Sequence, residues 1–156
     1  MAVLLAVTGG MDEFEGSRGN AGVSSRIQAV AGMAGVYDFV GRFSDPEQVA
    51  VQPQMKTKIQ TNGEWIGTPF SATDHCWQDA SAINHLDPSD PPILLMHSKN
   101  DRVLPWMQSR NMFLKLQDAG VPSMFELYET GGHAVQPKGK DPKAAMISFF
   151  KAHLEN

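Results

Sequence analysis

Apolar residues in the sequence are grouped into runs that predict three buried strands. The runs at 93–97 and 124–128 are rich in aliphatic and aromatic residues and are bounded by proline, glycine and polar residues, as strands commonly are. A third run, at 27–36, contains smaller residues, and its two glycines favour a strand to which neighbouring backbone approaches closely. We therefore expect three strands, in this order along the chain.

Other apolar positions recur at the spacing of helices. The stretch 106–120 has an imperfect amphipathic stripe and ends at a glycine, and Pro142 is well placed to start a helix over 144–154. Residues 79–86 also predict a short helix. The opening run, 2–7, predicts the last turns of a helix that a glycine pair closes, or alternatively a short disordered or strand-like terminus.

Strands that alternate with helices predict a parallel sheet covered by helices. Three strands are fewer than a typical sheet contains, and strand 27–36 is expected to present an unpaired edge. Such an edge favours self-association. Because a complete domain rarely begins with the end of a buried helix, we expect residues 1–156 to form a partial α/β domain.

Residues 39–76 interrupt the alternation. Prolines, glutamines and threonines break the apolar periodicity there, and one or two short helices are expected around 46–60. Insertions after a strand often cover a binding site, so the segment is either a cap or a solvated connection. Its aromatic side chains favour a packed cap. The polar, glycine-rich stretch 11–24 predicts a loop.

Composition and charge argue against several classes of protein. The chain has 156 residues, of which 42% are hydrophobic, which is enough for one domain with a core. Its formal charge of -4 and the lack of a basic stripe argue against a nucleic-acid partner.

No apolar run approaches the roughly 20 residues that span a bilayer. The single cysteine excludes an internal disulfide. Since the first residues lack the features of a signal peptide, a cytoplasmic location is the default expectation, unless a signal was lost with an N-terminal part.

Two titratable residues follow the last two predicted strands. Asp101 comes shortly after the run 93–97, and His133 follows a glycine pair after the run 124–128. Neighbouring parallel strands lie about 4.8 Å apart, so loops that leave their carboxyl ends can meet. A carboxylate can bind an imidazole at Nδ1–H and fix its tautomer, which leaves Nε2 free to act as a general base. On spacing alone, a turn-forming Asp101 and a plain glycine–histidine loop are alternatives, and an Asp in an Asn-Asp-Arg turn is more often a turn former.

The other histidines are weaker candidates for catalysis. His97 ends a strand and is expected to be a core residue or a residue that supports the site from behind. A zinc site made of His97, Asp101 and His133 would have suitable ligand types, but no local metal-binding spacing supports it. We predict no metal and no cofactor.

A set of short motifs occurs along the chain in the order found in one large superfamily. The motifs are Leu4 to Gly10 with Phe14-Glu15-Gly16, Pro91-Pro92, Ile93 to Met96, His97-Ser98, Asp101 to Pro105, Gln108-Ser109, Ala119-Gly120-Val121 and Gly131-Gly132-His133. As a set they resemble the C-terminal part of the α/β-hydrolase superfamily. The branch is that of esterases and lipases related to bacterial feruloyl and acetyl-xylan esterases, with prolyl-oligopeptidase-type peptidases more distant.

This resemblance implies an α/β-hydrolase fold and a serine carboxylic ester hydrolase that acts on a small-molecule ester. It implies that Asp101 is the acid of the catalytic triad and that His133 is its base. Two mild departures are His97-Ser98, where the family commonly has His-Gly, and Ser81-Ala82, where it often has Ser-Pro.

The family nucleophile is the severe departure. The family carries it in a Gly-x-Ser-x-Gly turn next to the oxyanion hole, and this pattern does not occur in the sequence. We expect the serine to lie upstream of Met1 and the chain alone to be inactive. Two alternatives remain open, namely a non-catalytic truncated or partner-completed module, and a prolyl-oligopeptidase-like serine peptidase that uses the same Asp101 and His133.

Overall fold

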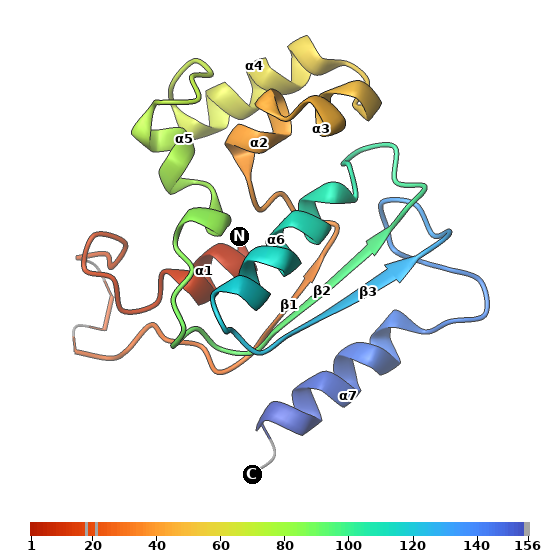
Figure 1. Ribbon diagram of the computed structural model, residues 1–156. Coiled ribbons are helices and arrows are strands. Elements are labelled where there is room, and N and C mark those ends of the chain that lie inside the picture. The colour runs from red at the N-terminus through yellow and green to blue at the C-terminus, as the bar shows by residue number, and fades with distance from the viewer. Residues whose placement is uncertain (18, 21, 155–156) are drawn as a thin grey trace.

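The computed structural model describes residues 1–17, 19–20 and 22–154, and its core is a parallel three-stranded sheet (Figure 1). The strands are β1 (Val30–Met33), β2 (Ile93–Ser98) and β3 (Ser123–Tyr128), in the order β1-β2-β3. Both strand pairings are parallel. The three expected strands and their expected parallel arrangement are confirmed, and β1 has a neighbour on one side only among the described residues.

Helices cover both faces of the sheet (Figure 1). Helices α1 (Ala2–Val7) and α6 (Met107–Asp118) lie on one face, and α7 (Pro142–Leu154) lies on the other. These three helices confirm the predictions at 2–7, 106–120 and 144–154. Gly120 follows α6 with a φ of 75°, the left-handed conformation that commonly ends a helix.

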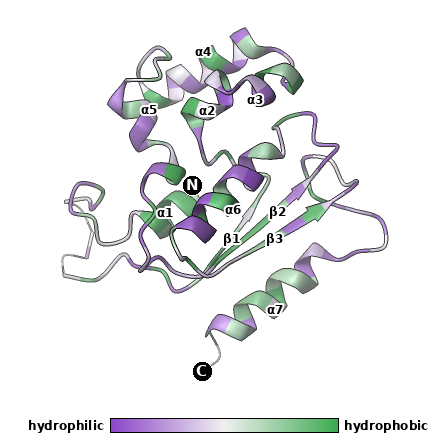
Figure 2. Ribbon diagram, in the orientation of Figure 1, coloured by the Kyte–Doolittle hydropathy of each residue, from purple (hydrophilic) through white to green (hydrophobic). Residues whose placement is uncertain are grey.

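Strand β2 is the centre of the hydrophobic core. Its six residues are all buried, and successive side chains enter opposite layers because strand side chains alternate between faces. Ile93 and Leu95 pack with α1 and α6, whereas Leu94 and Met96 pack with α7. Figure 2 shows hydrophobic residues along β2 and α1, and both hydrophobic and hydrophilic residues on α6.

A separate group of helices follows β1 and lies beyond the carboxyl ends of the strands (Figure 1). The group contains α2 (Phe39–Ser44), α3 (Pro46–Val51), α4 (Met55–Ile66) and α5 (His75–Asp79). Its own small core is aromatic, since the fully buried Trp77 contacts the rings of Phe39, Phe43 and Phe70. The segment expected to be an irregular excursion is thus more helical than its sequence indicated.

Two predicted elements have different bounds in the structure. The strand expected at 27–36 is shorter, because Ala34 adopts a left-handed φ of 44° that ends β1. The single helix expected at 79–86 is wrong: α5 ends at Asp79, and a separate 3-10 turn, η1 (Ala82–Asn84), follows. Between them, Ser81 is extended because its hydroxyl binds the N–H of Phe39 and the carbonyl of Trp77.

The stretch expected to be a loop, 11–24, contains no helix or strand among its described residues, and positions 18 and 21 lie outside the described residues. Within the part of the chain that the structure describes, no helix combines the length and the apolar character needed to cross a membrane.

Candidate active site

The register of the sheet brings the loops after β2 and β3 together. His97 is paired with Leu127, and Ser98 is paired with Tyr128 at the carboxyl end of the ladder. The pairing continues one step further, since the N–H of Lys99 donates to the carbonyl of Tyr128 at 2.8 Å. The two loops therefore leave the sheet side by side.

A second contact joins the two loops just before the catalytic candidates. The side-chain Oδ1 of Asn100 accepts a hydrogen bond from the N–H of Gly132 at 2.9 Å. Sequence analysis did not single out Asn100, although its place directly before Asp101 was a usable signal. The contact fixes the backbone from which His133 projects.

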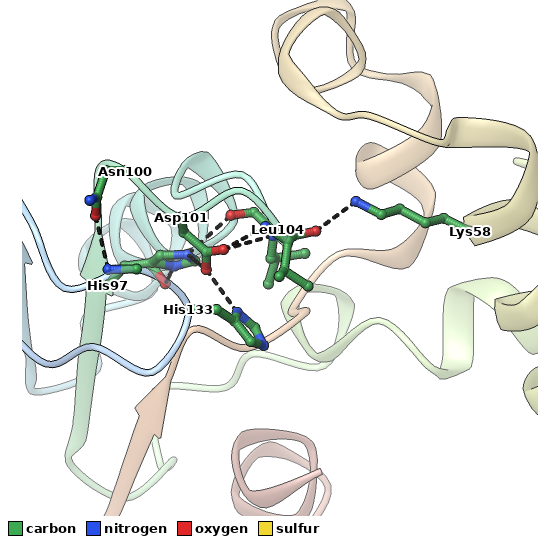
Figure 3. A network of polar contacts seen from close by, with 9 residues as sticks. Lys58, His97, Asn100, Asp101, Leu104 and His133 are labelled. Carbon is green, nitrogen blue, oxygen red and sulfur yellow. Dashed lines mark hydrogen bonds and ion pairs between the residues drawn. The ribbon is translucent and has the colours of Figure 1, made fainter.

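Asp101 and His133, the two residues that sequence analysis proposed as a pair, are in direct contact (Figure 3). Nδ1 of His133 lies 2.8 Å from Oδ2 of Asp101. The side chain of Asp101 is fully buried, whereas that of His133 is 48% exposed. Nε2 of His133 points away from the carboxylate (Figure 3), so an Nδ1–H tautomer would leave Nε2 able to accept a proton.

The Asp101 carboxylate is held by further donors. Its Oδ1 accepts hydrogen bonds from the backbone N–H groups of Val103 at 2.7 Å and Leu104 at 3.1 Å. Burial opposes ionisation of this group, but the hydrogen bonds from His133, Leu104 and Val103 together outweigh it and hold the pKa of Asp101 below its usual value. The Asp101 carboxyl is therefore ionised at neutral pH.

The glycine pair before His133 satisfies a steric requirement of its loop. Gly131 has a φ of 126°, and a side chain there would place its Cβ 2.8 Å from both Ser98 Oγ and the backbone nitrogen of Gln136. Gly132 is also left-handed, with a φ of 60°. Only glycine adopts both conformations at low cost, so the Gly-Gly sequence is required by the turn that presents His133.

His97 lies behind the pair and is completely buried. Its Nε2 is 3.0 Å from Oδ2 of Asp101 and 3.3 Å from the carbonyl oxygen of Leu104. Its Nδ1 is 2.7 Å from the hydroxyl of Ser109. The structure thus brings His97, Asp101 and His133 together, with His97 in the interior position that its place at the end of a strand predicted.

The helical group contacts the loop that carries Asp101. Nζ of Lys58, on α4, donates to the carbonyl of Val103 at 2.7 Å (Figure 3). A cavity of about 410 Å³ lies between this group and the loop, lined by the segment Ala50 to Pro53 and by Asp101 and Arg102. Sequence analysis did not identify Lys58, because nothing in its local sequence relates it to Val103.

Possible metal ligands gather elsewhere. Among the described residues, the three-residue group whose ligand atoms lie within 4.8 Å of one another is Asp74, His75 and Cys76, at the start of α5. Asp74 already uses one oxygen to cap that helix at the N–H of Cys76. In the group formed by His97, Asp101 and His133, Oδ2 of Asp101 is bound by one nitrogen of each histidine, and the second nitrogen of His97 faces the hydroxyl of Ser109.

Comparison with known proteins agrees with the fold and with a resemblance to ester hydrolases. Residues 1–116 match the family model named BD-FAE, a match that includes Asp101 and ends before His133. The chain is 28% identical over 93 residues to the probable carboxylic ester hydrolase LipM of Mycobacterium tuberculosis, covering 60% of this chain and 20% of LipM.

Solved structures with the same fold include esterases and a peptidase. A truncated form of a carbohydrate esterase from gut microbiota matches 99% of this chain and 55% of its own, with a TM-score of 0.74 and 24% identity. A puromycin-hydrolyzing peptidase of Mycobacterium tuberculosis matches 82% of this chain and 18% of its own, with a TM-score of 0.67 and 23% identity. The chain therefore spans about half, or less, of the proteins that it resembles.

The parallel three-stranded sheet and its flanking helices match the fold of these solved structures. The family match extends over most of the chain. The chain belongs to the BD-FAE family, and its sheet and helices form part of an α/β-hydrolase fold.

Proposed function

We propose that the chain provides the acid and the base of a serine carboxylic ester hydrolase. The observation that carries the proposal is the 2.8 Å contact between the buried carboxylate of Asp101 and Nδ1 of the half-exposed His133. The nucleophilic serine lies outside these residues, upstream in the chain or on a partner. A small-molecule ester is the substrate class, in keeping with the carboxylic ester hydrolase and carbohydrate esterase among the relatives.

In this function, His133 transfers a proton twice. Nε2 takes the proton of the serine hydroxyl as its oxygen forms a bond to the ester carbonyl carbon. The resulting imidazolium is stabilised by Asp101 and then gives the proton to the departing alcohol, which leaves an acyl-enzyme. A water molecule, deprotonated by the same nitrogen, releases the carboxylic acid and restores the serine.

The helical group over 39–76 is proposed to be a cap on this site. It lies beyond the carboxyl ends of the strands, contacts the Asp101 loop through Lys58 and borders the cavity beside Asp101. Ligands of α/β proteins commonly bind at that end of the sheet. A cap there would form the wall of the substrate pocket that faces the loop carrying Asp101.

Activity measurements test the proposal in two steps. The 156-residue chain is expected to give no turnover and no acyl-enzyme burst with p-nitrophenyl acetate. The product of the coding DNA extended upstream to an in-frame Gly-x-Ser-x-Gly is expected to hydrolyse the same ester. In that longer protein, Asp101→Asn should lower kcat by about 10⁴-fold, the size of effect seen when a triad histidine takes the wrong tautomer. If the 156-residue chain hydrolyses the ester and its His133→Ala variant does so equally well, the assignment of His133 as the base is contradicted.

A second candidate is a module that is not catalytic by itself and is completed by a partner. The specific observation is that β1 has no strand on its outer side within the described part of the sheet, while Met33 on it is 41% exposed. A parallel strand normally pairs on both sides, so a further chain could add there. The association state in solution tests this candidate.

The same acid and base would also serve a serine peptidase, and one of the similar folds is a peptidase. The two activities are separated by their substrates. A panel of acyl esters and aminoacyl amides, assayed with the upstream-extended protein, is expected to show faster hydrolysis of esters. Faster cleavage of the amides would favour the peptidase.

A further inference from the structure

The hydrogen-bond partners of His97 fit one of the two neutral tautomers of its ring. Nε2 faces two groups that can only accept, the ionised carboxylate of Asp101 and the carbonyl of Leu104, so Nε2 carries a hydrogen. Nδ1 faces the hydroxyl of Ser109, which can donate. The ring is therefore satisfied as the neutral Nε2–H tautomer, with Ser109 donating to Nδ1.

Burial keeps the ring in this state. Desolvation of the fully buried side chain lowers the pKa of His97, and it outweighs the opposing effect of the Asp101 charge. A neutral His97 leaves the negative charge of Asp101 available to His133. It also keeps a single N–H directed at the carboxylate, whatever the protonation state of the exposed histidine.

The donors to Asp101 are divided equally between its two oxygens. Oδ1 accepts from two backbone N–H groups, whereas Oδ2 accepts from two imidazoles, His97 at 3.0 Å and His133 at 2.8 Å. Between these two imidazoles, only His97 is rigidly held, because it is buried on a strand and has three polar contacts. The position of Oδ2, and so of the exposed ring, depends on the buried one.

We propose that His97 is a positioning residue whose Nε2–H, oriented by Ser109, holds Oδ2 of Asp101 where it selects the Nδ1–H tautomer of His133. The inference rests on the proposed roles of Asp101 and His133. The buried His97 would then support the site in addition to packing at the end of β2. Without its N–H, the carboxylate can rotate about its terminal bond, and the hydrogen bond between Asp101 and Nδ1 of His133 weakens.

The test uses the 156-residue chain itself and reads the tautomer of His133 directly. With ¹⁵N-labelled histidine, two-bond ¹H–¹⁵N correlations at about pH 8, above the ordinary titration range of histidine, distinguish Nδ1–H from Nε2–H rings. In the unchanged chain, His133 is expected in the Nδ1–H form. His97→Leu is expected to shift it toward the Nε2–H form, and His97→Gln, whose amide nitrogen can replace the lost donor, is expected to restore most of the Nδ1–H form.

A matched control and a second route cover loss of folding. Ser98 is the next residue on β2, is fully buried, and its Oγ has no hydrogen-bond partner among the described residues. Ser98→Ala should leave the His133 tautomer unchanged. If His97→Leu fails to give a folded amide spectrum, Ser109→Ala replaces it, since loss of the hydroxyl frees the His97 ring and should also reduce the Nδ1–H population of His133.

The outcomes separate this inference from the proposed function. If Asp101→Asn changes the His133 tautomer but neither His97→Leu nor Ser109→Ala does, the positioning role is overturned and the Asp101–His133 pair stands. If Asp101→Asn leaves the tautomer unchanged, the pair itself is overturned. If Ser98→Ala reduces the Nδ1–H form of His133 as much as His97→Leu does, the effect is one of packing and the positioning role is also overturned.

Discussion

Asp101 is the residue at which the hydrogen bonds of the candidate site meet. Its buried carboxylate receives four hydrogen bonds, two from the backbone of its own turn and two from histidine rings. An ionised group is stable in the interior only when it is compensated in this way. Asp101 thus shapes the turn through Oδ1, which binds backbone N–H groups, and contacts the two histidines through Oδ2. A turn-forming Asp101 is therefore compatible with the proposed role of Asp101 in the site.

The buried His97 predicts a pH dependence of stability. Because its pKa is lowered in the folded state, unfolding takes up a proton at pH values below its ordinary pKa of about 6.5. Its contribution to stability is present above that pH and is lost as the pH falls toward the folded-state value. The free energy of unfolding should fall by up to about 1.4 kcal/mol per pH unit in this window.

Urea denaturation of the chain and of His97→Gln, at several pH values between about 4 and 8, measures this contribution. The slope of stability against pH should be smaller in the variant, which has no titrating group at that position. Parallel curves for the two proteins would contradict the assignment of a neutral, buried histidine. The titration of Asp101 does not overlap with that of His97, because the pKa of Asp101 lies below the usual value of an aspartate.

At the level of elements, Gln108 joins α6 to the helical group beyond the sheet. Its Oε1 accepts from the N–H groups of Tyr37 and Asp38, and its Nε2 donates to the carbonyl of Asp38 and to Gln48. The side chain is 1% exposed. One amide therefore satisfies the backbone at the turn where the chain leaves β1 for α2.

Replacing Gln108 with methionine tests this junction. The change keeps the length of the side chain and leaves two N–H groups, those of Tyr37 and Asp38, without their acceptor. Since a buried unsatisfied group costs about 1–3 kcal/mol, we expect a loss of roughly 3 kcal/mol in the free energy of unfolding, measured by urea denaturation.

The matched control for this change is Gln117→Met on the same helix. Gln117 is exposed and donates to the hydroxyl of Ser123, so its replacement should change stability by less than about 0.5 kcal/mol. Equal effects of the two substitutions would show that the buried amide does not hold the junction.

On the scale of the whole molecule, the two edges of the sheet differ in character. The residues of β1 are Val-Ala-Gly-Met and carry no charge, whereas β3 includes Glu126. A pocket of about 350 Å³ is lined by Met1 and Leu4 at the start of the chain, by Val36 after β1, and by Phe39 and Trp65 of the helical group. Natural edge strands are commonly protected by charge, and β1 is not.

Association through β1 is therefore expected. The chain should be larger than a monomer by light scattering at micromolar concentration, and Met33→Lys, which places a charge on this edge, should shift it toward the monomer. Met124→Lys is the control, because Met124 is 48% exposed on the opposite edge strand. A monodisperse, folded monomer of the unchanged chain would argue against association at β1.

Local sequence was sufficient for the elements whose signals are local. The apolar run of β2, the glycine after α6 and the proline at the start of α7 each act within a few residues, and those elements lie where expected. The break in the helix predicted at 79–86 was missed because it depends on Ser81 binding the backbone of Phe39, more than forty positions away. No periodicity of the local sequence contains that contact.

For the site, the sequence by itself determined the order of the strands along the chain and which polar residues follow them, and so placed Asp101 and His133 on neighbouring loops. Only the tertiary structure decided what these residues touch. The link between Asn100 and Gly132, the contact of Lys58 with Val103 and the place of His97 behind the carboxylate all join positions on different elements. Hydrogen bonds require distances and directions that are fixed only when the sheet and helices have packed, so these contacts follow from the fold and not from the spacing of residues in the chain.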